Sequence, residues 1–336
     1  IRAEAMGAEA VIIFNQGDDP AVTGSSGDRL GLIVGTLGGE NVVDIPVVGA
    51  SFEQGVALAP LAPAPPATAR VLVETVTLTS QNVIAELPGK VPGNVVMAGA
   101  HLDSVPAGPG INDNGSGSAT LIEVAENLGN HKPVNTLRFA WWGAEEGGLI
   151  GSTAWVEQQL TNDTLDVALY MNFDMIGSPN YVQMVYDADE STFEAPVVVP
   201  PGSIAIEDTF ESFYTWAGVP YDDTEFSGRS DYQAFIDNGI PSSGLFTGAE
   251  EPKTDLQASI WGGDAGEQLD PCYHEACDDI DNIAIDALDV NADAVAFAVL
   301  TYAYSTESVN GVRGAKVPGN FKIPAPAGPQ GTWLEP

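Results

Sequence analysis

The sequence predicts an α/β fold built on a mainly parallel sheet. Residues 94–100, 136–142 and 167–173 are apolar almost throughout, as strands buried on both faces of a sheet are. Ligands of open α/β sheets bind at the carboxyl ends of the strands, so we expect the side chains there to share one edge. The residues that follow the three segments are His101, the pair Glu145 and Glu146, and Asp174.

A further acidic segment follows His101, where Asp113 lies within Asn112–Gly115. The chain has only three histidines, and His274 comes late, next to Tyr273. The third, His131, lies in a polar segment and is expected on the surface. Imidazoles and carboxylates without clustered cysteines suit zinc or a similar divalent ion, so this pattern predicts a site in which two metals share ligands.

Seven blocks, in this order, resemble the zinc aminopeptidases of the M28 family, above all the secreted Streptomyces-type enzymes. The resemblance runs from residue 99 to about 305, and the order of the blocks makes it specific. It implies an eight-stranded mixed sheet sandwiched by helices, and a zinc-dependent aminopeptidase. The blocks are 100–104, 110–118, 139–146, 172–178, 228–231, 244–248 and 272–274.

The resemblance also assigns the metal ligands. His101 and Asp174 correspond to the ligands of one zinc, Glu146 and His274 to those of the other, and Asp113 to the carboxylate that bridges them. Two cations roughly 3.5–4 Å apart can trap a hydroxide and polarise a scissile carbonyl. The resemblance therefore implies two zinc ions per chain.

Three further residues take chemical roles by the same resemblance. Glu145 is the expected general base, Tyr273 the donor to the oxyanion, and Asp103 the residue that orients His101. A Glu-Glu pair is more often a solvated first turn of a helix. Here the pair follows a buried strand within the ordered blocks, which favours the catalytic interpretation.

Two substrate contacts are implied. Arg229 corresponds to a residue near the amino end of the substrate, and Phe246 to part of an apolar pocket, which predicts a preference for large apolar N-terminal residues such as Leu. Arg229 could instead pair with one of the many surface acids, and Phe246 could be an ordinary core residue.

Composition excludes several partners. The 336 residues include 11 basic and 47 acidic side chains, and the net charge is −36, so nucleic acid and anionic membranes are poor partners. We expect peptide or protein N-termini as partners and a monomeric chain. No apolar run reaches about 18 residues, so no membrane span is expected. The chain starts at Ile1 without a signal peptide, which suggests a mature or truncated form.

The two cysteines, Cys272 and Cys277, flank Tyr273 and His274. Two reduced thiols would be the alternative to a disulfide. The relatives look disulfide-bonded here, so the resemblance implies a disulfide that holds the turn presenting these two residues. Such a bond indicates an oxidising compartment, and we expect a secreted protein.

Outside the resembling region, residues 1–70 look like the back half of a protease-associated (PA) domain, with a strand at 11–14 and a strand, cap and helix over 45–57. After a Pro- and Ala-rich run, a strand at 70–79 would begin the catalytic domain, 71–305. The tail, 306–336, is rich in Gly and Pro and reads as a linker or wrap.

Some questions stay open at this stage. Asp289 and Asp293 fall where some relatives bind a structural calcium, although helix capping is the simpler explanation. The alternatives to an aminopeptidase are an M28 carboxypeptidase, which needs more basic residues than Arg229, and a PA-bearing binding protein, which should have lost metal ligands.

Overall fold

The chain divides into two compact units, residues 1–79 and 80–336. A computed structural model describes residues 2–15, 17, 30, 32–33, 43–61, 70–73, 79–319 and 321–330. The predicted tail from residue 306 falls within the second unit and includes a short helix, α10 (Glu307–Asn310). The predicted boundaries near residues 70 and 305 stay predictions.

The first unit contains a pair of parallel strands, β1 (Val11–Phe14) and β2 (Val47–Ala50). The short helix α1 (Arg2–Ala5) precedes β1, and α3 (Phe52–Leu58) follows β2. Ser51 begins α3, because its side chain accepts a hydrogen bond from the amide of Gln54 while the Gln54 side chain accepts one from the Ser51 amide. The predicted strand at 11–14 and the strand, cap and helix over 45–57 are therefore confirmed.

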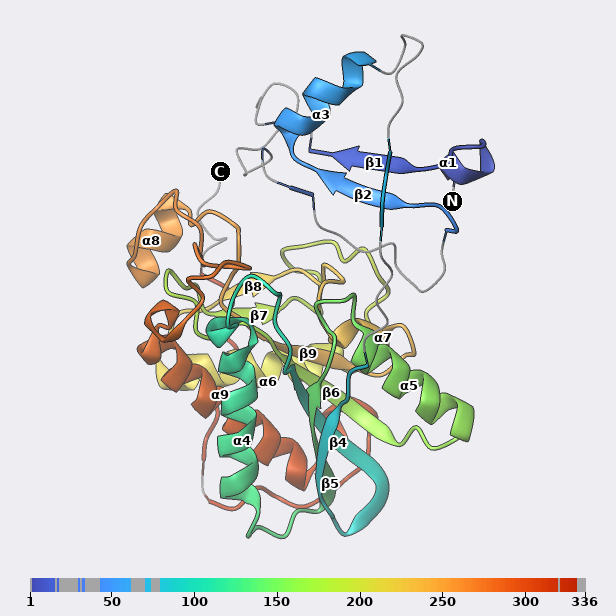
Figure 1. The fold of residues 1–336 in the computed structure, drawn as a ribbon. Helices are drawn as coiled ribbons and strands as arrows, with labels where there is room; N and C mark the ends of the chain where they lie inside the picture. The colour runs from blue at the N-terminus through green and yellow to red at the C-terminus, as the bar shows by residue number, and fades with distance from the viewer. Residues whose placement is uncertain are drawn as a thin grey trace. The chain divides into compact units, whose positions relative to one another are not determined.

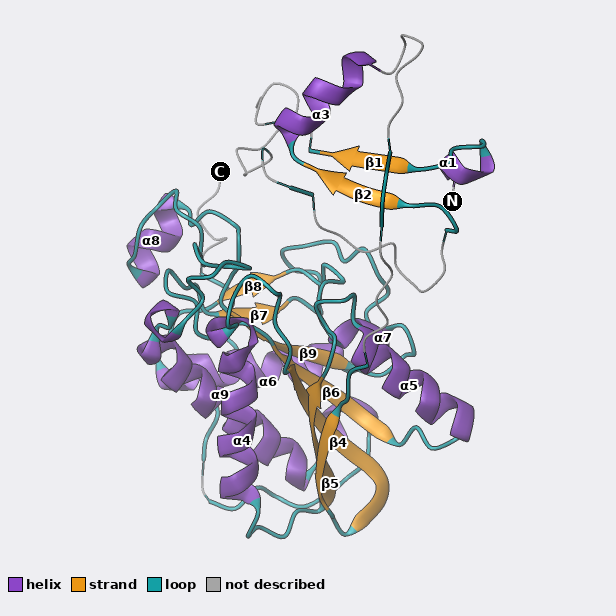
Figure 2. Cartoon of the chain, in the orientation of Figure 1, coloured by secondary structure: helices purple, strands orange, loops and turns teal. Residues whose placement is uncertain are grey.

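The second unit is a mixed sheet with helices on both faces (Figures 1 and 2). Among the described residues it has seven strands in the order β3-β5-β4-β6-β9-β7-β8. The strands are β3 (Val83–Leu87), β4 (Val91–His101), β5 (Asn135–Trp142), β6 (Val167–Phe173), β7 (Met184–Tyr186), β8 (Asp222–Thr224) and β9 (Ser242–Phe246). The helices are α4 (Gly117–Leu128), α5 (Ile150–Asn162), α6 (Ser203–Ala217), α7 (Tyr232–Ile236), α8 (Asp255–Trp261) and α9 (Ile285–Tyr304).

Alternation along the central strands explains the two layers of core. In β4, Val96 and Ala98 face one core, which α4, α6 and α9 cover, whereas Met97 faces the other, under α5 and α7. Both faces are buried, which is why these strands are continuously apolar in the sequence. Tyr170 of β6 stacks on Phe235 of α7 in the second core, with ring centroids 3.8 Å apart.

The three apolar segments of the sequence form three adjacent parallel strands, β5, β4 and β6. The predicted α/β fold is thus confirmed, with seven of the eight expected strands described. Residues 74–78 of the expected strand at 70–79 lie outside the described residues, and 70–73 are not in a strand. Within the described ranges, no helix has the length and apolar character needed to cross a bilayer.

Candidate metal centre and active site

Three strand ends and two loops bring the predicted metal ligands together. His101 is the last residue of β4, and it is paired in register with Trp142, the last residue of β5. Glu146 follows β5, and Asp174 directly follows β6. Because these strands are parallel neighbours, their ends meet at one edge of the sheet, as the sequence predicts. Asp113 lies in the helical turn before α4, and His274 lies in the loop after α8.

Asp113 lies between the two histidines. Its Oδ1 is 3.0 Å from Nε2 of His101, and its Oδ2 is 3.3 Å from Nε2 of His274. Each histidine also contacts a carboxylate of its own: Oδ1 of Asp174 is 3.2 Å from His101, and Oε2 of Glu146 is 3.0 Å from His274. The result is two sets of one imidazole and one terminal carboxylate, joined by Asp113.

This donor set fits two divalent metal ions. Each of the two sets offers an imidazole nitrogen, an oxygen of its terminal carboxylate and an oxygen of Asp113, and zinc binds all of these donors. Oε1 of Glu146 is buried and has no hydrogen-bond partner among the described residues, so this oxygen is available to bind a metal ion. Nδ1 of His101 donates to the main-chain oxygen of Asp103 at 3.0 Å, which leaves Nε2 free to bind a metal.

Without a metal, the two histidines share protons with the carboxylates. Burial alone would lower the pKa of His101, but Asp174 and Asp113 raise it well above its usual value. Burial would also lower the pKa of His274, but Asp113 and Glu146 outweigh this effect and raise that pKa to about 10. Burial would raise the pKa of Asp113, yet the two histidines hold it below its usual range. Metal ions bound at these atoms would replace the protons.

Glu145 points at the same centre but contacts it less closely, with Oε2 4.0 Å from Nε2 of His101. Its side chain is buried, and this burial raises the pKa of Glu145 to about 9, with Asp174 and Asp231 adding to the effect. The amides of Glu145 and Glu146 donate to the two carboxylate oxygens of Asp103, at 3.0 and 3.3 Å. The Asp103 side chain therefore holds the glutamate turn, while its main-chain oxygen contacts His101.

Tyr273 and Arg229 lie side by side at the rim. Nη2 of Arg229 donates to the phenol oxygen of Tyr273 at 3.2 Å, and Nη1 forms an ion pair with Glu250 at 2.7 Å. The Tyr273 ring stacks on His274, with centroids 3.8 Å apart. Burial raises the pKa of Tyr273, so the phenol stays protonated and can donate a hydrogen bond.

A cavity of about 120 Å³ opens over these groups. Phe246, at the end of β9, lines it together with Met175 and Tyr186. Two carboxylates that contact neither histidine, Glu225 and Glu251, also line it. The cavity thus joins the metal-binding groups to an apolar wall and to additional negative charge.

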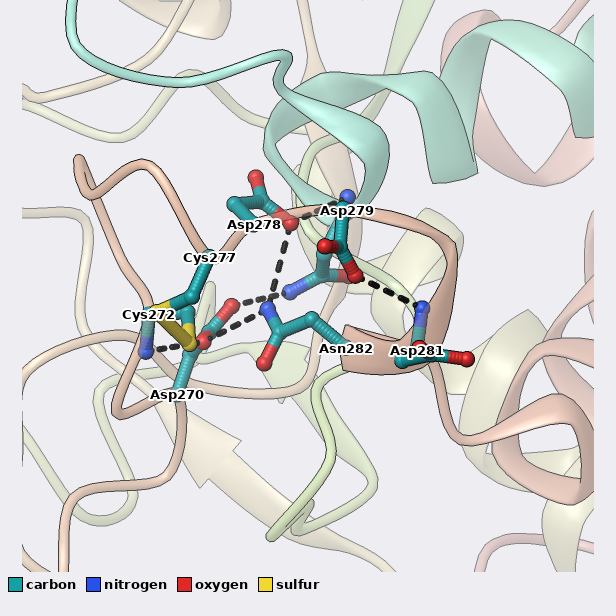
Figure 3. Close-up of a disulfide and its surroundings, with 8 residues drawn as sticks. Asp270, Cys272, Cys277, Asp278, Asp279, Asp281 and Asn282 are labelled. Atoms are coloured by element: carbon teal, nitrogen blue, oxygen red, sulfur yellow. Dashed lines mark hydrogen bonds between the residues drawn. A yellow bond between two sulfur atoms is a disulfide. The ribbon is translucent and has the colours of Figure 1, made fainter.

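The disulfide between Cys272 and Cys277 is present, as predicted, and closes the loop that carries Tyr273 and His274 (Figure 3). Beside it, Asp270 accepts a hydrogen bond from the amide of Cys272 at 2.9 Å.

Asp278, directly after Cys277, ties this loop to the bridging carboxylate. It accepts hydrogen bonds from the amides of Asn112 and Asp113, at 2.8 and 3.0 Å, and from the side chain of Asn282 at 3.1 Å. The disulfide loop and the Asp113 turn are therefore one connected structure. Sequence reasoning missed both Asp270 and Asp278, although their position beside the cysteines was a usable signal.

A chain of buried hydrogen bonds supports Asp174 from the other side. Trp142 donates to Tyr170, Tyr170 to Asn172, and Asn172 to Ser230, at 2.8, 3.0 and 2.8 Å. Ser230 in turn donates to Oδ2 of Asp174, leaving Oδ1 toward His101. Ser230 stands in one of the blocks found in the sequence, but no role was predicted for it.

Three predicted positions lie away from this centre. His131 is an exposed residue after α4, as expected. Asp289 and Asp293 are exposed on α9, one turn apart. No third histidine, cysteine or acid among the described residues completes a metal-binding group with them, and the calcium there stays a prediction.

The comparisons with known proteins agree with this geometry. Residues 82–299 match the model of peptidase family M28. The chain belongs to this family. The resemblance seen in the sequence is thereby confirmed.

Two relatives with similar sequences are named as aminopeptidases. An aminopeptidase of Pseudomonas aeruginosa is 46% identical over 310 residues, covering 92% of this chain and 56% of its own length. A probable leucine aminopeptidase 2 of Aspergillus fumigatus is 44% identical, over 90% of this chain and 59% of its own. The chain thus spans somewhat more than half the length of these relatives.

Solved structures are similar as well. An aminopeptidase from Aneurinibacillus aligns with 98% of this chain and 68% of its own, at a TM-score of 0.66 and 27% identity. A zinc aminopeptidase from Bacillus subtilis aligns with 93% of this chain and 68% of its own, at a TM-score of 0.63 and 26% identity.

Proposed function

We propose that this protein is a dizinc aminopeptidase that removes N-terminal residues from peptides. The observation that carries the proposal is the position of Asp113, with one carboxylate oxygen toward each of two histidines. The relatives named as aminopeptidases, and the zinc aminopeptidase of Bacillus subtilis among similar structures, support the assignment.

His101 and Asp174 would hold one zinc ion, and His274 and Glu146 would hold the other. Asp113 would be a ligand of both ions. When bound, the two ions supply Lewis acidity and lower the pKa of a water molecule. Glu145 takes the proton of the attacking water and passes it to the leaving amine, since it lies beside the ligands without binding a metal itself.

Tyr273 donates its phenol proton to the oxyanion that forms on the scissile carbonyl. Arg229 fixes the direction of this donor, because its guanidinium already donates to the phenol oxygen and leaves the phenol proton free to point elsewhere. The ion pair with Glu250 holds the guanidinium in turn.

The cavity favours an aminopeptidase over a carboxypeptidase. Among the described residues that line it, Arg229 is the only lysine or arginine, and it is engaged by Glu250 and Tyr273. Glu225 and Glu251 offer negative charge for an α-amino group instead. Met175, Tyr186 and Phe246 form the apolar wall, which supports a preference for large apolar residues such as Leu.

We further propose secretion, which the disulfide supports because such bonds persist in oxidising compartments. A monomeric state and a partial PA-like domain at residues 1–70 belong to the same proposal.

Hydrolysis of Leu-, Phe- and Lys-p-nitroanilides, each beside its N-acetylated form, tests the function. We expect fast release from the free Leu and Phe substrates, slow release from Lys, and none from the acetylated forms, because the cavity binds a free amino group. Chelation should abolish the activity and zinc should restore it. Binding of two zinc ions without hydrolysis would favour the non-catalytic alternative, and activity on acetylated peptides with a free C-terminus would favour the carboxypeptidase.

A further inference from the structure

A second group of acids lies at the β8 edge of the sheet, outside the metal centre. Glu207 and Glu211 lie one turn apart on α6, and Asp223 lies in β8. One ligand oxygen from each of these three lies within 4.8 Å of the others. The segment after β7 brings Asp187 and Asp189 equally close to Glu207.

Glu207, Glu211 and Asp223 are buried without compensating charge. Glu207, Glu211 and Asp223 are 3%, 7% and 3% exposed. No lysine, arginine or histidine in the described part of the chain forms an ion pair with any of them. Buried carboxylates that lack a partner are costly, so an arrangement of this kind needs either protons or a cation.

Hydrogen bonds satisfy only part of the Asp223 and Glu207 carboxylates. Oδ2 of Asp223 accepts hydrogen bonds from the hydroxyls of Ser191 and Thr192, but its buried Oδ1 has no partner among the described residues. Oε2 of Glu207 accepts the amides of Ala188 and Asp189, both at 3.1 Å. Hydrogen bonds thus hold one oxygen of Asp223 and one of Glu207 and leave the other oxygen of each available.

Asp187 has a structural role in this region and is not one of the proposed ligands. Its two oxygens accept the amides of residues 191, 192 and 193, so it shapes the loop rather than offering a free ligand. This loop places the Ser191 and Thr192 hydroxyls on Asp223 and the amide of Asp189 on Glu207. The acids are therefore held in place from β7, β8 and α6 together.

We propose that Glu207, Glu211 and Asp223 bind one calcium ion, with Asp189 as a further ligand. Calcium takes six to eight oxygen ligands at about 2.3–2.6 Å, so two oxygens on the same ion can be at most about 5 Å apart, a limit that Glu207, Glu211 and Asp223 meet and that Asp189 meets toward Glu207. The cluster offers only oxygen donors, without the imidazole or thiolate that zinc prefers, which separates this site from the dizinc centre.

The metal-free state is consistent with this assignment. Burial, reinforced by the neighbouring acids, raises the pKa of Glu207 to about 9, that of Glu211 to about 8 and that of Asp223 to about 6. Without a cation the cluster holds protons at neutral pH, and a calcium ion would displace them.

The site lies behind one wall of the substrate cavity. Tyr186 and Thr224 line the cavity, and they are the chain neighbours of Asp187 and Asp223. Successive side chains of a strand point to opposite faces, so β8 presents Asp223 to the acidic cluster and Thr224 to the cavity. Bound calcium would therefore fix this wall, and its loss should raise KM more than it lowers kcat.

Calcium titration of the zinc-loaded full chain in buffer free of other divalent ions tests the site. Calorimetry should show one calcium per chain, and at about 100 times the Kd the Tm should rise by roughly 5 °C. Glu211→Gln and Asp223→Asn should lose most of this rise. Glu126→Gln, an exposed position on α4, and Asp293→Asn on α9 should keep it.

Two outcomes would overturn the proposal. One is that the wild-type protein binds no calcium at about 10 mM, roughly ten times the weakest Kd of extracellular calcium sites, and the other is an equal Tm rise in Glu211→Gln. Loss of binding in Asp293→Asn alone would place the calcium on α9 instead. Where one cluster variant fails to fold, the other cluster variant and Asp293→Asn still separate the acidic cluster from α9, and a wild-type protein that binds no calcium rejects the site without any variant. The KM measurement rests on the proposed aminopeptidase activity, whereas calcium binding and Tm do not, so the two can fail separately.

Discussion

Replacing Asp278 by Asn should weaken both the fold and the zinc centre, although this residue contacts no metal ligand side chain. Its buried carboxylate accepts two amides, of Asn112 and Asp113, and the side-chain amide of Asn282. An asparagine has one acceptor oxygen. If it keeps the Asn112 and Asn282 bonds, its NH₂ group faces the amide of Asp113.

The expected loss follows from these contacts. One charge-assisted hydrogen bond disappears, a buried amide is left unpaired, and the remaining bonds weaken. The free energy of unfolding should therefore fall by about 2–3 kcal/mol. Asp113 should also lose its fixed position, and residues that orient metal ligands typically contribute 10- to 100-fold in metal affinity. Denaturant unfolding and zinc titration of the purified protein measure the two effects.

Asp279→Asn is the matched control (Figure 3). Asp279 is the next residue along the chain and is exposed. Among the described residues its side chain accepts only the amide of Asp281, a bond that asparagine can also accept. It should change stability by less than about 0.5 kcal/mol. If Asp278→Asn matches this control in both stability and zinc affinity, the reasoning about the loop is wrong.

Three more changes separate the roles at the centre. Glu145→Ala should keep both zinc ions but lower kcat by about 10²–10⁴-fold, and loss of zinc instead would make it a ligand. Tyr273→Phe keeps the ring on His274 and should lower kcat by roughly 10–10³-fold with little change in KM; unchanged kcat with normal zinc content would reduce it to a packing residue. Replacing Cys272 and Cys277 by serine should lower the free energy of unfolding by about 2–3 kcal/mol and weaken zinc binding, which calorimetry and zinc analysis measure. If either quantity stays unchanged, the loop does not depend on the disulfide.

The central part of the site was predictable because parallel strands place their ends together. Apolar runs ending at His101, Glu146 and Asp174 were enough to put these residues at one edge of the sheet. Asp113 and His274 follow no strand directly, so their place beside His101 depended on the family resemblance rather than on a local pattern.

Other contacts could not be read from the sequence because they join distant segments. Asp103 was expected to orient His101. Its main-chain oxygen accepts from Nδ1 of the imidazole at 3.0 Å, its Oδ1 lies 3.9 Å from the same nitrogen, and its carboxylate also holds the amides of Glu145 and Glu146, which the sequence did not indicate. Arg229 was open to two interpretations. Its ion pair with Glu250 matches the pairing with an acid, its bond to Tyr273 was not foreseen, and its contact with substrate stays a prediction.

The acidic cluster was the hardest to foresee. In a chain with 47 acidic residues, a single Asp or Glu carries little information. Glu207 and Glu211 share a helix face, but only the folded sheet brings Asp223 beside them. Their burial and missing counter-charge are properties of the tertiary structure and leave no mark in the local sequence.

Zinc titration of the metal-free protein, followed by Leu-p-nitroanilide hydrolysis, tests most directly whether Asp113 joins two metals in one centre. The geometry predicts that activity rises to its maximum at about two equivalents of zinc, and that Asp113→Ala loses high-affinity binding at both positions because each depends on one of its oxygens. Full activity at one equivalent, or an Asp113→Ala variant that binds two zinc ions as tightly as the wild-type protein, would contradict it.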